Sequence, residues 1–279
     1  MRGSSPRSLT WSGDAMWALR YPEEAARVPL VTGWMEARAV LALWAGAATL
    51  ILAQVLPAQA VAVIAVAAVH GGLIAAALLW GGARVVEAGV AIAVLAAARI
   101  VVSIHPLGAL AYLALPVWLG RLALRGRLFR LGLAAPWPWG AVAIGALAGS
   151  ALALHLVTSA SRTLGYGVHF DVAAFGPAFA YDLGANVLSA ELFFRGALMQ
   201  HLWRRWTFAT ALTVASIAAT LRYCADPFVG TVELRLGAAV YMAMLAILNG
   251  WLYRWSGSLL PGLAAAAVFF ACYRLLAMG

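Results

Sequence analysis

Long apolar stretches separated by short polar turns run through the chain from residue 38 to residue 277. Most contain about twenty apolar residues, the length that an α-helix needs to cross the hydrocarbon core of a bilayer. The pattern predicts about nine spans, at residues 38–57, 59–80, 84–104, 106–120, 137–158, 171–190, 207–224, 232–253 and 258–277. Because 106–120 is short enough to be re-entrant, the prediction is a bundle of about eight or nine helices.

The composition supports this fold class independently. Apolar residues make up 65% of the chain, charged residues only 10%, and the mean hydropathy is +0.90. These values lie far outside those of soluble globular proteins. We therefore expect an all-α, polytopic integral membrane protein that is surrounded by membrane lipids.

The arginines predict the orientation of the helices. The net charge of +9 reflects 19 basic residues, all of them arginine. Many lie in short turns, including the loop 121–130, Arg204–Arg205 and Arg254. The positive-inside rule places these turns in the cytoplasm, which explains the charge better than nucleic acid binding does. The prediction is a protein of a bacterial cytoplasmic (inner) membrane, with its N-terminus inside and its C-terminus outside.

Residues 1–37 differ from the rest. They lack the apolar stretch of a signal peptide and combine charges with Trp11, Trp17 and Trp34. Because indole rings favour the headgroup level, we predict a cytoplasmic or interfacial segment, with a docking arm for a neighbouring subunit as the alternative. The predicted organisation is this segment, N-terminal transmembrane helices over residues 38–130, and a C-terminal transmembrane core over residues 131–279.

Small residues at helical spacing indicate where helices approach each other closely. Gly140, Gly145 and Gly149 lie in one predicted span. Such patterns let two backbones come near each other. They predict packing and carry no functional weight alone.

Residues 189–196, Ser-Ala-Glu-Leu-Phe-Phe-Arg-Gly, place an acid and a base four residues apart in an apolar chain. Positions i and i+4 of a helix share one face, so Glu191 and Arg195 can pair. An acid inside the bilayer is a candidate functional residue, because its charge is costly unless it faces a protein interior or a water-filled cavity. The competing interpretation is a pair that only anchors the helix near the membrane surface.

Several motifs in the last third of the chain together resemble the CPBP (Abi) family of CAAX-protease-like and bacteriocin-processing-like membrane proteins. Residues 191–196 are followed by a Trp/Arg-rich turn at 203–206 and by Trp-Leu-Tyr-Arg-Trp-Ser-Gly-Ser-Leu-Leu-Pro at 251–261. Family members show Glu-Glu-x-x-x-Arg-Gly, then Phe-x-x-x-His, then Gly-Ser-Leu-x-Pro and His-x-x-x-Asn. The resemblance covers about residues 175–275 and implies a CAAX-protease-like helical core in the C-terminal part.

The resemblance implies an intramembrane endopeptidase in which glutamates and two histidines activate a water, directly or through a metal. Only Glu191 and Arg195 match these motif residues. The other positions hold Ala190 for the first glutamate, Ala219 and Tyr223 (or Ala218 and Arg222, shifted by one) for Phe-x-x-x-His, and Ala266 and Phe270 for His-x-x-x-Asn. This pattern indicates a pseudoenzyme.

Other residues do not supply the missing groups. The histidines stand at 70, 105, 155, 169 and 201, before both family histidine positions, and each is interpreted as a packing or interfacial residue. Cys224 and Cys272 form no Cys-x-x-Cys motif and are interpreted as small buried residues. No metal site and no cofactor is therefore predicted, and zinc is expected only if the protein is an active protease.

Charged residues within the predicted spans need partners, because an unpaired charge there is costly. Arg222 lies at or beside the first missing histidine, and we predict that it closes an ion pair with Glu191. A locked pair would then replace a water-activating one. Arg99 and Asp182 are expected to find partners on other helices.

Three functions remain open. The first is a catalytically inactive subunit of a membrane complex that binds another integral membrane protein, a peptide or a lipid through the former substrate cavity. The second is an active endopeptidase, of CAAX or leader-peptide type, that uses Glu191. The third is a transporter or permease component, which the lack of an evident inverted repeat disfavours. No nucleic acid partner is expected.

Overall fold

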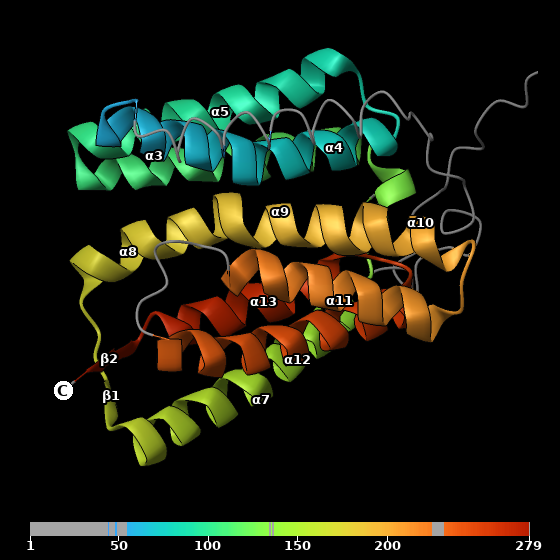
Figure 1. The fold of residues 1–279 in the computed structure, drawn as a ribbon. Coiled ribbons are helices and arrows are strands. Elements are labelled where there is room, and N and C mark those ends of the chain that lie inside the picture. Colours follow the sequence, from blue (N-terminus) through green and yellow to red (C-terminus); the bar gives the residue numbers. More distant parts are fainter. Residues whose placement is uncertain are drawn as a thin grey trace, which may run out of the picture.

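In a computed structural model, the chain forms a bundle of helices (Figure 1). The structure describes residues 44, 48, 55–133, 135, 137–224 and 232–278. The first part contains α3 (Ala58–Val66), the π-helical turn η2 (Ala67–Gly71), α4 (Gly72–Trp80), α5 (Val85–Ile104), the 3₁₀ segment η3 (Pro106–Leu113), α6 (Ala114–Leu124) and the 3₁₀ turn η4 (Phe129–Leu131).

The second part contains longer helices and two short strands. It comprises α7 (Trp139–Leu164), β1 (Tyr166–Val168), α8 (Val172–Tyr181), the π-helical η5 (Asp182–Val187), α9 (Leu188–Ala190), the π-helical η6 (Glu191–Met199), α10 (Gln200–Trp203), α11 (Phe208–Cys224), α12 (Val232–Ser256), α13 (Leu260–Tyr273) and β2 (Leu276–Met278). The segments from α8 to α10 follow one another without a break and form one long helix.

The predicted helical membrane bundle is confirmed. Within the described ranges, four helical segments are long and apolar enough to cross a membrane: Ala58–Trp80, Val85–Ile104, Pro106–Leu124 and Trp139–Thr163. Pro106–Leu124 exceeds the predicted 106–120, because the helix continues past Arg121. The predicted spans that begin at 59, 207 and 258 match α3–α4, α11 and α13. The predicted span 38–57 lies almost wholly outside the described residues.

The basic turns gather at one end of the bundle, on the right in Figure 1. There Arg127 donates from Nη2 to Glu87 Oε2 at 3.1 Å. Gln200 Nε2 also donates to the carbonyl of Arg130, at 3.1 Å. The loop 121–130 and the turn after α10 therefore share one end, as the charge pattern predicts. Which side of the membrane this end faces stays a prediction, and residues 1–37 lie outside the described residues.

The opposite end is closed by a small two-stranded sheet. β1 and β2 pair antiparallel, with Tyr166 opposite Met278 and Val168 opposite Leu276. The amide of His169 also donates to the carbonyl of Leu275 at 2.8 Å. This sheet ties the segment that follows α7 to the segment that follows α13.

One apolar core connects the N-terminal and C-terminal helices. A single cluster of buried residues extends along the chain from Val66 to Leu259. The predicted division of the transmembrane region at residues 130 and 131 therefore falls between helices that share a core. The division itself stays a prediction.

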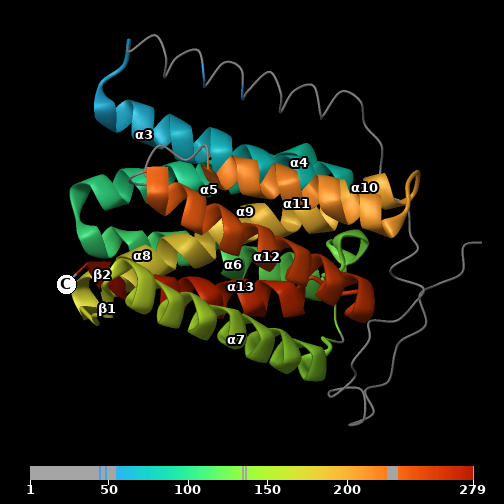
Figure 2. The same ribbon diagram turned by 60° about the horizontal axis from the view of Figure 1, so that its bottom comes forward.

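α7 and α13 lie side by side, as Figures 1 and 2 both show, and glycines set their separation. A Cβ atom at Gly145 would collide with the backbone of Pro261, and one at Gly149 with the backbone of Ala265. Backbone atoms cannot move aside as a flexible side chain can. The glycine pattern in the predicted span 137–158 thus marks a close helix contact.

We expect Gly149→Leu to lower the free energy of unfolding by at least about 1–3 kcal/mol, because the added side chain forces α7 away from α13. Thermal unfolding in detergent would measure the loss. Gly89→Leu on α5 is the matched control, since a Cβ there meets nothing within 4 Å. Equal melting temperatures for the two variants would contradict this account of the contact.

Candidate functional site

Three π-helical segments carry five of the eleven polar side chains that are buried in the described part of the chain. η2 contains His70, η5 contains Asp182 and Asn186, and η6 contains Glu191 and Arg195. All five residues are at most 8% exposed. π-Helical turns are rare and occur frequently at functional sites, because the wider turn redirects side chains. Buried polar side chains are therefore frequent in the π-helical segments of this protein.

Glu191 is enclosed by protein. It is 2% exposed, and its Oε1 accepts a hydrogen bond from Asn249 Nδ2 at 2.8 Å. Arg195 Nη1 lies 3.5 Å from the same oxygen, so the structure brings together the two surviving motif residues. Asn249 comes from α12, eleven residues before α13 begins, and holds the carboxylate more closely than Arg195 does.

The second oxygen of Glu191 is different. Glu191 Oε2 and Asn249 Oδ1 are both buried, and neither has a hydrogen-bond partner within the described part of the chain. Gly262 of α13 closes this spot, because a Cβ there would lie 3.1 Å from Oε2. Glu191 Oε2 therefore lies against the backbone of α13 at Gly262. A buried acceptor without a partner can be satisfied by a donor such as a water molecule.

The predicted ion pair between Glu191 and Arg222 is wrong. Arg222 Nη1 donates to Asn186 Oδ1 at 2.7 Å, and Nη2 donates to His70 Nδ1 at 2.6 Å. Nη2 also lies 3.4 Å from Ser189 Oγ. The reason is geometric: Glu191 stands two residues after Ser189, and positions two apart project from different sides of a helix. Arg222 meets the side that carries Asn186 and Ser189.

The contacts of His70 fix its protonation pattern. A guanidinium only donates hydrogen bonds, so His70 Nδ1, which faces Arg222, must be the acceptor. The hydrogen then resides on Nε2, which donates to Tyr181 Oη at 2.6 Å. Ser189 Oγ lies 2.9 Å from Nδ1 as well. His70 is thus a neutral imidazole that connects α3–α4 to the long helix.

A buried carboxylate requires a partner, and Asp182 has one on another segment. It is fully buried, and Arg274 donates to it from Nε at 2.6 Å and from Nη2 at 2.9 Å. Asn186 Nδ2 lies 3.4 Å from its Oδ1. Arg274, Asp182, Asn186, Arg222 and His70 therefore form one continuous polar network. Among the described residues, Arg99 has no carboxylate within ion-pair distance.

Apart from Arg222 in the shifted register, the positions that the motif comparison matches to catalytic groups of the family are packed in hydrophobic clusters here. Tyr223 and Phe270 are 8% and 5% exposed, and their ring centroids lie 6.5 Å apart. Both rings belong to one hydrophobic cluster, which also contains Ala266. Ala219 and Ala190 pack in a neighbouring apolar cluster.

Metal ions require sets of ligand side chains that lie close together. Within the described ranges, no three or more His, Cys, Asp or Glu side chains are close enough together to hold a metal ion. Glu191 has an amide and a guanidinium beside it, which are not the carboxylate, imidazole or thiolate groups that zinc prefers.

Sequence reasoning did not identify several residues of this region, among them Asn249 and His70. Asn249 was an unremarked amide in an apolar span, and His70 was interpreted as a packing residue. A buried amide or imidazole in a membrane span needs a hydrogen-bond partner, and that need was the available signal. The identity of each partner depends on helix packing, which hydropathy does not encode.

Comparison with known proteins supports the resemblance found in the motifs. A family model described as type II CAAX prenyl endopeptidase Rce1-like matches residues 177–270. The matched range begins in α8, includes Glu191, Arg195 and Asn249, and ends in α13. No curated protein and no solved structure matches the chain. The recognition of a CPBP-type helical membrane region is thereby confirmed over this range.

Proposed function

We propose that this Rce1-like membrane protein is catalytically inactive and acts as a subunit that binds another integral membrane protein. One observation carries the proposal: the aromatic pair Tyr223 and Phe270 packs at positions where the family places catalytic groups. An intramembrane endopeptidase needs a general base beside a water in an open cavity. Neither ring can take up a proton from a water.

Glu191 supports the same proposal through its surroundings. Its charge is balanced by Arg195 and its Oε1 is bound by Asn249, so the carboxylate contributes to packing between η6 and α12. Glu191 then stabilises the folded protein although the peptidase activity is lost. The protein then needs no zinc and no other cofactor, and its partners are membrane lipids and a membrane protein.

A second function is favoured by one specific observation. Glu191 Oε2 and Asn249 Oδ1 are buried acceptors without a hydrogen-bond partner in the described part of the chain. A water bound between them would be held by a carboxylate, as in an endopeptidase that uses Glu191 as its base. This alternative predicts cleavage of a membrane-bound peptide that is lost with Glu191→Gln.

We further propose that the end carrying the loop 121–130 faces the cytoplasm of a bacterial inner membrane. The turn with Arg204 and Arg205 lies at the same end, and basic turns are retained on the cytoplasmic side. A cysteine introduced at position 126 should then react with a membrane-impermeant reagent only after cells are opened. Reaction in intact cells would contradict this orientation.

Isolation from native membranes in mild detergent tests the subunit proposal. We expect the chain to purify with one other integral membrane protein in fixed stoichiometry, measured by quantitative mass spectrometry, and without a stoichiometric transition metal in elemental analysis. Isolation of the chain alone would contradict the proposal. One metal per chain, lost with Glu191→Ala and retained with Glu87→Ala, would support the endopeptidase instead.

A further inference from the structure

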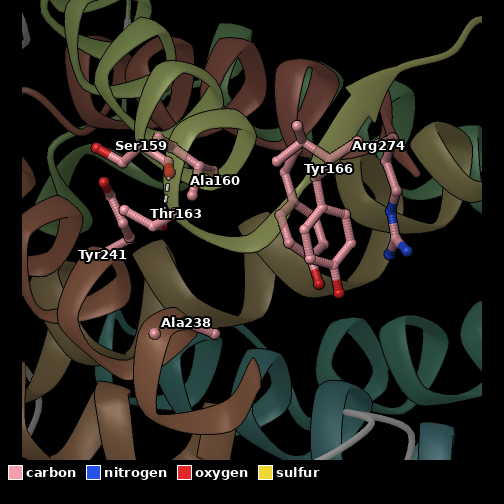
Figure 3. A pocket seen from close by; sticks show the side chains of 11 residues that line it. Ser159, Ala160, Thr163, Tyr166, Ala238, Tyr241 and Arg274 are labelled. Carbon is pink, nitrogen blue, oxygen red and sulfur yellow. Dashed lines mark hydrogen bonds between the residues drawn. The ribbon is translucent and has the colours of Figure 1, made fainter. Parts of the chain in front are cut away.

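A cavity of about 370 Å³ lies at the end of the bundle that is opposite the basic turns (Figure 3). Its walls come from the last turns of α7, from the N-terminal part of α12 and from the segment between α13 and β2. Most of the wall is apolar, with Leu156 and Ala160 from α7, Ala238 from α12 and Leu276 from β2. A cavity of this size and lining suits part of a small amphipathic molecule.

Polar groups lie on two sides of this cavity. Figure 3 shows Arg274 and Tyr166 on one side and the α7 residues Ser159, Ala160 and Thr163 on the other. Arg274 uses one hydrogen on Nε and one on Nη2 to bind Asp182, which leaves the second hydrogen of Nη2 and both hydrogens of Nη1 as further donors. A guanidinium in this arrangement can donate to a phosphate oxygen, with a tyrosine hydroxyl as a second donor.

The cavity is separate from the site around Glu191. Asn249 stands eleven residues after Ala238 on α12, which corresponds to about 16 Å along a helix. Gly262, which lies against Glu191, stands eleven residues before Tyr273, another lining residue. The two regions are thus about three helical turns apart on both helices.

α7 and α12, which both line the cavity, also expose apolar side chains on their outer surfaces. Leu154 of α7 is 65% exposed, and Val240 of α12 is 59% exposed. Such side chains on a membrane helix contact lipid. The cavity is thus formed by helices that are themselves in contact with bilayer lipid.

We propose that this cavity binds a phosphate-bearing membrane lipid. Part of an acyl chain lies against Leu156, Ala160 and Ala238, and the phosphate accepts hydrogen bonds from Arg274 and Tyr166. Asp182 already balances the charge of Arg274, so recognition depends on hydrogen bonding to the phosphate more than on net charge. Free phosphate lacks the apolar part, and a lipid without phosphate lacks the acceptor.

Native mass spectrometry and thermal unfolding of the full chain in detergent test the proposal with three probes. Dioleoylphosphatidylglycerol should form one retained adduct and raise the melting temperature. Dioleoylglycerol, which lacks the phosphate, should bind at least about tenfold more weakly, and inorganic phosphate should not shift the melting temperature. Equal binding of dioleoylglycerol, or equal stabilisation by inorganic phosphate, would overturn the proposal.

Variants that fill the cavity locate the site. Ala160→Phe should weaken phosphatidylglycerol binding by more than about tenfold, because the ring occupies the acyl-chain volume. Ala151→Phe, at an exposed position of the same helix, is the matched control and should bind as the parent does. If Ala160→Phe does not fold, Ala238→Phe on α12 gives the same comparison. Unchanged binding in a folded, cavity-filled variant would overturn the proposal.

Tyr166→Phe tests the phosphate end, because it removes a hydroxyl and keeps the ring. We expect about two- to tenfold weaker binding of phosphatidylglycerol, the effect of one lost hydrogen bond. Binding of dioleoylglycerol should not change. A variant that binds phosphatidylglycerol as the parent does would contradict the assignment of the phosphate to this side of the cavity.

Discussion

Replacing Asp182 by leucine should lower the free energy of unfolding by roughly 3–5 kcal/mol, because the change leaves the half-buried guanidinium of Arg274 without its partner. The pair is formed by two short hydrogen bonds, at 2.6 and 2.9 Å, to a fully buried carboxylate. Denaturant titration in detergent would measure the loss. We expect the double variant Asp182→Leu/Arg274→Leu to recover much of it, since no charge is then left unpaired.

The control for this pair is Asp171→Leu. Asp171 is exposed and caps α8 by accepting a hydrogen bond from the amide of Ala173 at 2.9 Å. Loss of an N-cap costs about 1 kcal/mol, which is clearly less than the loss expected at Asp182. A double variant as unstable as Asp182→Leu alone would show that the effect is not one of charge pairing.

The second large effect is expected at Glu191. Glu191→Gln should lower the free energy of unfolding by roughly 3–5 kcal/mol, because Arg195, only 4% exposed, then lacks a counter-charge. Glu191→Leu combined with Arg195→Leu should recover a good part of this loss. Glu87→Gln is the matched control, since its partner Arg127 is 34% exposed and such pairs contribute about 1 kcal/mol or less.

Glu191→Gln also separates the two candidate functions. A catalytic glutamate is often replaced without loss of stability, while turnover disappears. A structural glutamate shows the opposite behaviour. If Glu191→Gln has the same melting temperature as the parent and a peptide-processing phenotype is lost, the subunit proposal is wrong and the protein is an endopeptidase.

Hydropathy predicted the helices well where a span is uniformly apolar. α5, α11 and α13 begin and end within a few residues of their predicted limits. The prediction failed at the span 171–190, because the helix does not stop before Glu191 and continues to Trp203. Charged residues lower the hydropathy of that part, although its side chains are buried against other helices and not against lipid.

The site was predictable only in part, for a related reason. The spacing of Glu191 and Arg195 is a local property, and the motif revealed it. The partners of Arg222 and Glu191 come from other helices, at His70 and Asn249, and depend on how those helices rotate against one another. The π-helical turns that aim these side chains have no hydropathy signal.

The pairing of Asp182 with Arg274 also constrains how the protein is made. The two residues lie 92 positions apart, and Arg274 is the last arginine of the chain. At ribosomal rates of roughly 5–20 residues per second, Asp182 is synthesised about 5–20 seconds before its partner exists. During that interval the carboxyl group needs another source of hydrogen bonds, or its own proton, to remain at membrane depth. A chain stopped before the end of α13 never acquires Arg274, so its Asp182 stays without this partner.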